Sequence, residues 1–341
     1  MEYNEILSAA LLLSMDERLS LLACLEQSSQ NVSVLFLRRE ELKNKQVGCP
    51  HCASRSYYRH GIDKGSQRFK CKSCCRTFTE HTGTWLSGLH KKELADDYLV
   101  QMQSSQSLDK ISKELHINKK TAFDWRHKIL SGLSLDSGVD FEGITESDET
   151  FWEHSQKGSR SLNRKGRKRG KSAKEENTRG VSNNKATVIV SKDRKDALTL
   201  SLITLGKISK ADIAESFQGK QPLKSILCSD GHVSYKGFAS DLKLQHVVLR
   251  SDLKQFVKNG IYHIQHVNSL HNRLKKWINE QFWGVSTKYL QNYLNWFRMK
   301  ERLKLSSNKQ KEFLEASIQD KQAWVKYRYI DFAYQTLIAT Q

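Results

Sequence analysis

Two pairs of cysteines constrain the fold of this chain more than any other feature. The sequence "CPHC" holds Cys49 and Cys52, and "CKSC" holds Cys71 and Cys74, with eighteen residues between the pairs. Zn²⁺ takes four soft ligands in a tetrahedron, and two such knuckles joined by a β-hairpin supply them. The intervening "YYRHGIDKGSQRFK" alternates aromatic and basic residues, as a two-stranded ribbon with a turn does. We therefore expect a structural Zn²⁺ in a zinc ribbon at residues 46–82.

Other roles for these cysteines stay open. A redox dithiol or plain buried thiols are alternatives to the metal site. Cys75 directly follows Cys74 and could replace it as a ligand, and His51 and His60 are spare imidazoles. The seven cysteines are an odd number, and their paired spacing favours metal binding in a reducing compartment over a disulfide framework.

The charge of the chain predicts a polyanionic partner. Its 341 residues, enough for two or three domains, include 56 Lys and Arg against 37 Asp and Glu, for a net charge of +19. Such an excess favours nucleic acid or an anionic membrane. The opening "MEYNEILSAALLLSM" begins with acids, and its apolar run is too short to span a membrane. We expect a cytoplasmic bacterial protein with no membrane partner, associated with the nucleoid when bound to DNA.

Helices are expected on both sides of the ribbon. Ser14 and Glu17 form a capping-box pattern that predicts a helix over residues 15–27, within an N-terminal helical segment at 1–45. Residues 90–135 contain "SLDKISKELHINKKTAFDWRHKIL", whose apolar spacing predicts a helix, a break and a second helix, as in a helix-turn-helix. The DNA-binding candidates on the second helix are Lys119, Lys120 and Arg126. The alternative is a helical hairpin with a solvated basic face.

Over positions 138–300 the residue pattern favours β-strands alternating with helices. β-rich runs at 141–148, 185–193 and 197–204 precede a helix, a strand ending at Asp230, a helix, a strand and a helix. This order predicts an α/β fold with a mixed sheet, a ribonuclease H-like core. The C-terminal residues 301–341 are expected to be a helical tail. The aromatic-rich helical run "LQNYLNWFRMKERLKL" before it closes over the core or contacts a second subunit.

A basic block interrupts the core. Residues 157–174 contain nine basic side chains in eighteen positions and no acid. Such a block cannot bury an apolar face, so we interpret it as a phosphate-binding arm; a solvated loop that only raises the charge is the alternative. Its DNA-binding candidates are Arg164, Lys165, Arg167, Lys168 and Arg169.

Three acids lie close together in "TESDETFW". Residues two apart in a strand share a face, so Glu146 and Asp148 are expected to point one way and Glu149 the other. Asp230 ends a neighbouring strand as "SDG", so Asp148 and Asp230 can converge. Paired carboxylates bind Mg²⁺ or Mn²⁺, which support phosphoryl transfer. The alternative is that both aspartates are turn or cap residues.

The residues also carry a family resemblance. "GITESDETFW", "CSDGHVSYKGF" and "YHIQHVNSLHNRLKKWI" follow the cysteine ribbon in that order, over about Gly48 to Arg298. Together they resemble the zinc-ribbon insertion-sequence transposases with an ISXO-like DDE core. The resemblance implies an enzyme that cuts DNA at element ends and joins the freed 3′-hydroxyl to target DNA, with Mg²⁺ or Mn²⁺ as cofactor.

The resemblance also implies site residues. Asp148 would be the first catalytic acid and Asp230 the second, and the third position falls on His271, where most DDE enzymes have Glu. Lys275 lies one turn later on the same helical face and could touch a phosphate. His266 and Asn268 are candidates to support the site. The alternatives are that His271 is a surface histidine and that Glu280 is the third ligand.

Three hypotheses for function follow. The first is a metal-dependent transposase whose partners are the double-stranded inverted ends of its element and target DNA, acting as a homodimer or a higher assembly on DNA. The second is a non-catalytic DNA-binding regulator, including a decayed or domesticated transposase. The third is a nuclease or resolvase that hydrolyses DNA without joining it. Two strand-end aspartates in the correct order favour the first.

Overall fold

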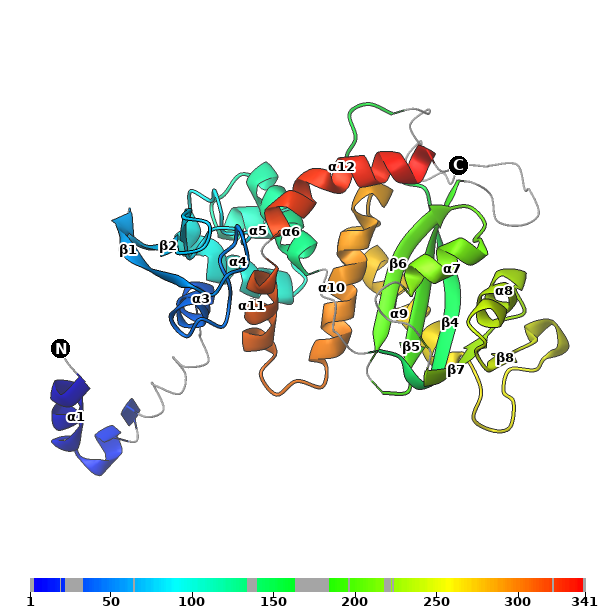
Figure 1. Cartoon of the computed structure of the whole chain (residues 1–341), viewed down its shortest axis with the longest axis horizontal. Helices are drawn as coiled ribbons and strands as arrows, with labels where there is room; N and C mark the ends of the chain where they lie inside the picture. Colours follow the sequence, from blue (N-terminus) through cyan, green and yellow to red (C-terminus); the bar gives the residue numbers. More distant parts are fainter. Residues whose placement is uncertain are drawn as a thin grey trace.

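The structure is a computed structural model of the chain. It describes residues 3–18, 20–21, 33–63, 65–133, 140–162, 184–195, 197–217, 222, 224–320 and 322–339. Figure 1 shows the ribbon and a group of helices on one side and a sheet with its flanking helices on the other, with the last helix lying across both. The ribbon, the helices and the sheet therefore lie in space in the same order as along the chain. The C-terminal helices are the exception, because they pack back against the N-terminal side.

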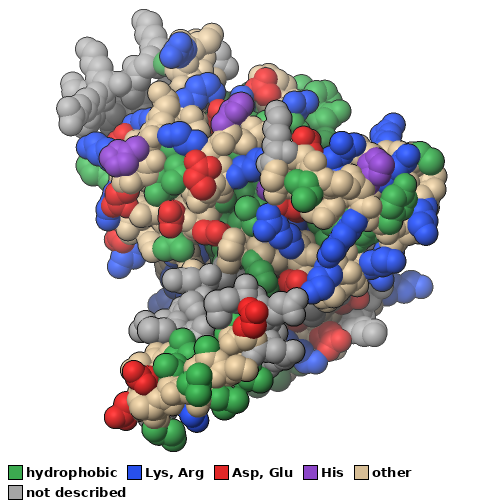
Figure 2. All heavy atoms as spheres, turned by 90° about the vertical axis from the view of Figure 1, so that its left-hand side faces the viewer, with side chains coloured by type: hydrophobic (Ala, Val, Ile, Leu, Met, Phe, Trp, Pro, Cys, Tyr) green, Lys and Arg blue, Asp and Glu red, His purple; other side chains and the backbone are tan. Residues whose placement is uncertain are grey.

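The N-terminal segment begins with helix α1, Tyr3–Leu11. The predicted capping box is present, because the Ser14 backbone N–H donates to Glu17 Oε2 at 2.9 Å and the Glu17 N–H donates to Ser14 Oγ at 3.3 Å. The rest of that predicted helix, residue 19 and residues 22–27, lies outside the described residues. In Figure 2, hydrophobic side chains gather at the lower end of the face, where α1 lies. Helix α3, Val34–Lys43, then leads into the ribbon.

The ribbon is a three-stranded antiparallel sheet. Strand β1 is Tyr57–Asp63, β2 is Ser66–Cys71 and β3 is Thr77–Thr79, in the order β1-β2-β3. The rings of Tyr57, Phe69 and Phe78 pack on one another with centroids 5.3 to 5.7 Å apart. These aromatics give a very small module an apolar centre. The predicted hairpin is confirmed, with a third strand added.

The helix-turn-helix pattern is confirmed as local structure. After the short helix η1, Lys92–Leu94, come α4, Ala95–Gln103, α5, Leu108–Glu114, and α6, Lys119–Gly132. Ser107 caps α5 and Asn118 caps α6, since each side chain accepts a backbone N–H of the first turn. The break between α5 and α6 lies at His116–Asn118, where His116 has a φ of 49°. The capping residues therefore fix the two-helix geometry locally.

The core is a five-stranded mixed sheet in the order β6-β5-β4-β7-β8. Its strands are β4, Glu142–Glu153, β5, Lys185–Asp193, β6, Leu198–Leu205, β7, Lys224–Ser229, and β8, His246–Val248. Strand β4 pairs antiparallel with β5 and parallel with β7, and β7 pairs parallel with β8. The element order predicted from the sequence, three strands followed by alternating helices and strands, is confirmed, and β4 is the central strand.

Helices cover both faces of this sheet. In β5, Val188 and Val190 face the helices α9, Gln265–Phe282, and α10, Leu290–Leu303, whereas Ile189 between them belongs to the opposite core. That opposite face is covered by α7, Lys210–Ser216, and α8, Val233–Asp241. The two-residue alternation of the strand thus feeds two apolar cores. The short helices η2, Ser251–Leu253, and η3, Thr287–Tyr289, complete the connections.

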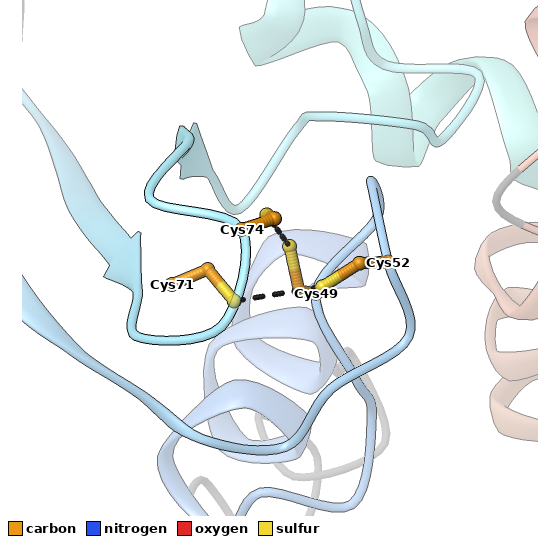
Figure 3. A group of neighbouring side chains, drawn as sticks. All are labelled: Cys49, Cys52, Cys71 and Cys74. Carbon is orange, nitrogen blue, oxygen red and sulfur yellow. Dashed lines mark hydrogen bonds between the residues drawn. The ribbon is translucent and has the colours of Figure 1, made fainter.

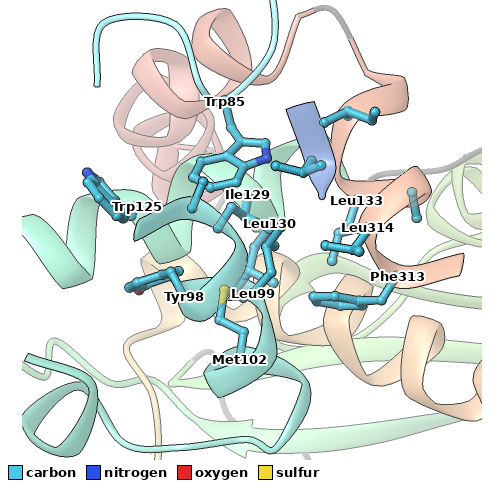
Figure 4. Close-up of a cluster of buried hydrophobic side chains, with 14 of the residues drawn as sticks. Trp85, Tyr98, Leu99, Met102, Trp125, Ile129, Leu130, Leu133, Phe313 and Leu314 are labelled. Carbon is cyan, nitrogen blue, oxygen red and sulfur yellow. The ribbon is translucent and has the colours of Figure 1, made fainter. Parts of the chain in front are cut away.

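The C-terminal helices join the two sides of the molecule. Helix α11 is Lys309–Gln319 and α12 is Ala323–Ala339. Figure 4 shows side chains of α4 and α6 packed with Phe313 and Leu314 of α11 in one buried cluster. Tyr327 of α12 donates to Asp124 of α6 at 2.6 Å, and the Tyr334 hydroxyl lies 2.8 Å from His154 Nε2 just after β4. The run at residues 290–305, expected to close over the core or to contact a second subunit, forms α10 and packs on the sheet through Leu290, Leu294 and Phe297.

Within the part of the chain that the structure describes, none of the helices combines the length and the apolar character needed to cross a membrane.

Candidate active site

The four predicted zinc ligands come together. The Sγ atoms of Cys49, Cys52, Cys71 and Cys74 all lie within 4.8 Å of one another. Figure 3 shows the side chains converging from the two knuckles, with Cys49 and Cys74 3.7 Å apart and Cys52 and Cys71 3.6 Å apart. A tetrahedral ion with bonds of about 2.3 Å would separate its sulfur ligands by about 3.8 Å. The cluster therefore has the dimensions of a metal–thiolate site.

The spare groups near the knuckles lie apart from the cluster. Cys75 is exposed and has a φ of 57°, so the chain turns away from the four sulfurs directly after Cys74. His51 is exposed and its Nε2 lies 3.3 Å from the Thr77 carbonyl oxygen, and His60 is exposed on β1. Of the alternatives for the ligand set, the geometry selects Cys74 over Cys75.

A second cluster lies where the central strands end. Ligand atoms of Asp148, Glu149 and Asp230 lie within 4.8 Å of one another. Strands β4 and β7 run parallel with Glu146 opposite Cys228, so two residues further along each strand Asp148 and Asp230 are level. Both aspartates line a hollow of about 330 Å³ together with Asn268 of α9 and residues of the segment after β8. The expectation that Asp148 and Asp230 converge agrees with this geometry.

Glu149 differs from the expectation. It was expected to point away from Asp148, yet its carboxylate belongs to the same cluster. The backbone does alternate, because Ser147 contacts the Tyr235 hydroxyl of α8 at 3.2 Å while its neighbours on either side face α9. The longer glutamate side chain reaches past the end of β7 toward Asp148 and Asp230. Strand alternation determines the direction of the Cβ atom only. Because β7 ends at Ser229, the Glu149 side chain has room to bend toward the two aspartates.

The pKa values reflect burial and mutual repulsion. The pKa of Asp148 is raised well above its ordinary value, chiefly by burial and then by the charges of Glu149 and Asp230. Burial and Asp230 raise the pKa of Glu149 to about 7. Three carboxylates in this arrangement repel one another, and a shared cation would relieve the repulsion.

His271 lies on α9 beside Asp148. Its Nδ1 is 3.9 Å from Asp148 Oδ2, and the residue is 7% exposed. Burial and the neighbouring Lys275 lower the pKa of His271 to about 4. It is therefore a buried neutral imidazole and not the surface histidine of the alternative interpretation.

Lys275 and Glu280, the two other candidates on α9, lie on different sides of the helix. Lys275 is half-buried, its Nζ lies 5.7 Å from the centre of the Trp152 ring, and burial lowers its pKa while Asp148 opposes that shift. Glu280 is exposed, and its carboxylate lies 3.9 Å from Lys276 Nζ on the outer side of the helix. Lys275 is thus on the same side as the acidic cluster, and Glu280 is not.

Glu146, the third acid of the strand, forms a separate cluster. Its carboxylate is 1% exposed and accepts the backbone N–H groups of His266 at 2.9 Å and Val267 at 3.2 Å. Arg194 Nη2 lies 3.0 Å and His266 Nδ1 2.6 Å from Glu146 Oε1. These N–H groups are in the first turn of α9, whose own N-cap makes no side-chain hydrogen bond. Glu146 therefore caps α9 from the neighbouring strand, and His266 contacts Glu146 instead of the cluster of Asp148, Glu149 and Asp230.

The candidate DNA contacts on α6 differ in their exposure to solvent. Lys119 and Lys120 are exposed in the first turn, where they form ion pairs with Asp109 at 2.6 Å and Asp124 at 3.1 Å. Arg126 is only 1% exposed and donates through Nη2 to the Gln106 carbonyl at 2.6 Å. The expectation that Arg126 lies on an exposed basic face is wrong, because α6 is buried from Trp125 onward against the C-terminal helices. The arm residues Arg164, Lys165, Arg167, Lys168 and Arg169 lie outside the described residues.

Comparisons with known proteins agree with this architecture. Residues 140–301 match the family model of the ISXO2-like transposase domain. The chain is similar to the uncharacterized protein in transposable element ISH50 of Halobacterium salinarum, with 26% identity over 262 residues that cover 75% of this chain and 86% of that protein. Among solved structures, a pre-cleavage Mos1 transpososome matches with a TM-score of 0.19 and 11% identity over 66% of this chain and 79% of that one. A TM-score this low supports no conclusion.

The matched residues contain the whole five-stranded sheet, the acidic cluster and helix α9. The resemblance found in the sequence is confirmed over residues 140–301, which match the ISXO2-like transposase domain, and the chain is similar to a protein of a transposable element.

Proposed function

We propose that the chain is an insertion-sequence transposase that cuts the ends of its element and joins the freed 3′-hydroxyl to target DNA by divalent-metal-dependent phosphoryl transfer. The observation that carries the proposal is the meeting of Asp148, Glu149 and Asp230 at the ends of two parallel strands, with His271 beside them. Hard carboxylate oxygens at a hollow on a basic protein suit a metal that acts on a polyanion.

The residues present fit a divalent cation. Among the described residues, Glu149 Oε2 and His271 Nε2 have no hydrogen-bond partner although both atoms are buried. Glu149 Oε2 lies in the cluster with Asp148 and Asp230, and an unpaired carboxylate oxygen beside two more carboxylates is a setting that a cation satisfies. His271 approaches Asp148 through Nδ1 and borders this cluster. Asp148, Asp230 and His271, joined by Glu149, would hold Mg²⁺ or, with a softer imidazole in the set, Mn²⁺. Such an ion would polarise a phosphate and lower the pKa of an attacking hydroxyl.

The remaining groups position the DNA. Lys275 lies on the side of α9 that faces the cluster and supplies a cation for a non-bridging phosphate oxygen. Asn268 lines the hollow and offers an amide to the same strand. Glu146 holds the first turn of α9, and therefore the helix that carries His271 and Lys275, against the strand of Asp148.

The modules outside the core would hold the element ends. A structural Zn²⁺ at the four cysteines stabilises the ribbon at residues 46–82, and the helix-turn-helix at 90–135 places Lys119 and Lys120 on DNA. The insertion at 157–174 supplies further phosphate contacts through its arginines and lysines. Because two ends must be held at once, we expect a homodimer or a higher assembly on DNA.

Two other functions predict different products. A regulator would bind element ends and leave them intact, and a nuclease or resolvase would release cut ends without joining them. The half-buried carboxylate cluster favours an enzyme over a regulator, because without a role these mutually repelling acids would only destabilise the fold.

A joining assay tests the proposal. The purified chain is mixed with labelled DNA from the flanks of its own gene and a supercoiled target, with Mg²⁺ or Mn²⁺. We expect joined product from the wild type and none from Asp148→Asn, which keeps the shape of the side chain but removes its charge. Cut ends without joined product would establish the nuclease, and tight binding without cutting under either metal would establish the regulator.

A further inference from the structure

A large cavity separate from the acidic hollow lies between the helix-turn-helix and the core. It has a volume of about 850 Å³. The start of α5 and the first part of α6 form one side, and the segment after β4, the C-terminal end of α9, η3 and the start of α10 form the other. Neither the carboxylate cluster nor the cysteine cluster contributes to its lining. The proposed chemistry leaves this cavity without a role.

Aromatic rings make up much of the cavity wall. They are Phe123, Phe282, Trp283, Tyr289 and Tyr293. Four of them pack on neighbouring rings, with Phe123 and Tyr289 5.1 Å apart and Phe282 and Tyr293 4.9 Å apart between ring centres. Trp283 instead is 86% exposed, so a large flat ring stands at the mouth of the cavity.

The loop that carries Trp283 is held in place. Trp283 ends α9 with a φ of 52°, in the left-handed region. Lys157 Nζ donates to the carbonyl oxygens of Phe282 at 2.7 Å, Trp283 at 3.0 Å and Gly284 at 2.8 Å. A cation on the last carbonyls of a helix stabilises its end. The exposed indole is therefore presented by an ordered backbone.

Two buried nitrogens of cavity-lining residues lack a hydrogen-bond acceptor among the described residues, although the Arg126 guanidinium also packs 5.7 Å from the centre of the Phe282 ring and 5.3 Å from that of Trp296. Arg126 Nε and His127 Nε2 are buried without a hydrogen-bond partner in the described part of the chain, and both residues line the cavity. The Asn292 amide Nδ2 can only donate, and it lies 3.2 Å from His127 Nδ1, so Nδ1 accepts and Nε2 carries the proton. Two N–H donors are thus left for a ligand with acceptor atoms.

The charge of the lining selects an anionic occupant. Among the described residues that line the cavity, Lys119, Arg126, Lys157 and Lys288 are cations, and Asp109 is the only acid. Lys119 pairs with Asp109 and Lys288 with Asp331, so the positive charge available to a ligand comes from Arg126 and Lys157. Lys157 is also the first residue of the basic insertion. Rings for stacking, N–H donors and surrounding cations form the combination that binds nucleotides of single-stranded or unpaired DNA.

We propose that this cavity binds one unstacked nucleotide of the DNA substrate, with its base stacked on Trp283 and its acceptor atoms toward Arg126 and His127. The inference rests on the proposed function, since it takes the ligand to be the DNA that the transposase acts on. Trp283 lies twelve residues beyond His271. Along a helix axis this is about 18 Å, or about five base-pair steps of DNA. The cavity therefore captures a base near the cut, and the enzyme opens the helix there.

Oligonucleotide binding by the full-length protein tests this assignment. The probe is a fluorescein-labelled single strand of about 12 thymidines, a length within the site sizes of single-strand-binding folds. It is titrated without Mg²⁺ or Mn²⁺ and followed by anisotropy. Trp283→Ala should weaken binding at least about fivefold, because stacking on one aromatic contributes roughly 1–3 kcal/mol. Trp283→Phe keeps a ring and should bind within about twofold of wild type. The backbone bonds at this position do not depend on the side chain, so these variants retain the fold.

A matched control and a second readout make the test specific. Phe332 is 69% exposed on α12 and is not among the described residues that line the cavity, so Phe332→Ala should bind as the wild type does. A single 2-aminopurine in the probe should lose fluorescence on binding to the wild type and keep it with Trp283→Ala, because stacking on the indole quenches it. Equal binding by Trp283→Ala and wild type, or an equal loss in Phe332→Ala, would overturn the proposal.

The joining assay separates this proposal from the proposed function. If Trp283→Ala binds the probe as tightly as wild type while the wild type joins DNA, the nucleotide site is wrong and the transposase function stands. If Trp283→Ala loses binding while the wild type forms no joined product, the nucleotide site stands and the proposed function fails.

Discussion

At the scale of single residues, the cysteine cluster makes the sharpest contrast. Cys52 belongs to the four-sulfur cluster, whereas Cys75 is exposed and outside it. We expect Cys52→Ser to abolish zinc binding and to unfold the ribbon, because a site this small depends on its metal for stability. Cys75→Ser should keep one zinc per chain. Mass spectrometric metal analysis and thermal melting measure both, and zinc lost equally from the two variants would contradict the assignment.

The third catalytic position gives a second residue-scale prediction. His271 is buried 3.9 Å from Asp148, and Glu280 is exposed beside Lys276. His271→Ala should therefore lower the joining rate by at least about tenfold, the loss typical of a disturbed metal site. Glu280→Ala should join at the wild-type rate. Full joining by the first variant and none by the second would move the third ligand to Glu280.

Individual residues also show how far sequence reasoning reaches. The approach of Asp148 and Asp230 follows from strand order alone, since parallel neighbours end at the same edge. Glu149 was missed because alternation describes Cβ directions and not how far a long side chain bends. The adjacency of the two acids in "DET" was the available signal. Arg126 was misplaced because a basic residue on a helix does not reveal which face packs against helices from a distant part of the chain.

At the scale of elements, Glu146 ties β4 to α9. Glu146→Gln removes the charge that faces Arg194 and the α9 N–H groups. A buried donor left without a proper acceptor costs about 1–3 kcal/mol, so we expect a loss of that order in the free energy of unfolding. Hydrogen exchange should quicken in the first turn of α9, around His266 and Val267. Glu153→Gln, at the exposed end of the same strand, is the control and should change neither quantity.

The contact between α6 and α10 predicts a pH dependence. Burial, aided by Arg126, lowers the pKa of His127 to about 3, against an ordinary value of about 6.5. In the window between these values the unfolded chain binds a proton that the folded chain excludes, so stability falls as the pH falls. One such group contributes a slope of about 1.4 kcal/mol per pH unit. His127→Asn should flatten the decline between pH values of about 6 and 4 in urea unfolding. An unchanged slope would contradict this.

Elements were the level at which the sequence was most informative. Hydrophobic periodicity, caps and turn residues predicted the ribbon, the helix-turn-helix and the order of strands, because these features depend on local preferences. The position at which α12 packs on the rest of the molecule could not be predicted. Its contacts with Asp124 and His154 join positions about 200 residues apart along the chain, and no local pattern encodes them.

At the scale of the whole molecule, shared helices connect the helix-turn-helix, the aromatic cavity and the acidic hollow. The helix-turn-helix shares a buried cluster with α10, α11 and α12, and α10 also packs on the sheet, whereas the ribbon has a small cluster of its own. Helix α9 carries His271 toward the acidic hollow and ends at the aromatic cavity beside α6. One helix thus links the acidic cluster to the cavity that borders the helix-turn-helix.

The central claim of this account is that carboxylates from two adjacent strands hold the cation that serves DNA joining. Mn²⁺ binding to the full-length protein, followed by electron paramagnetic resonance, tests it most directly. The account predicts that Asp148→Asn and Asp230→Asn each weaken Mn²⁺ binding at least about tenfold. Asp252→Asn, which changes an exposed acid paired with Arg250, should leave it unchanged. Mn²⁺ binding that survives both substitutions in the cluster would contradict the claim.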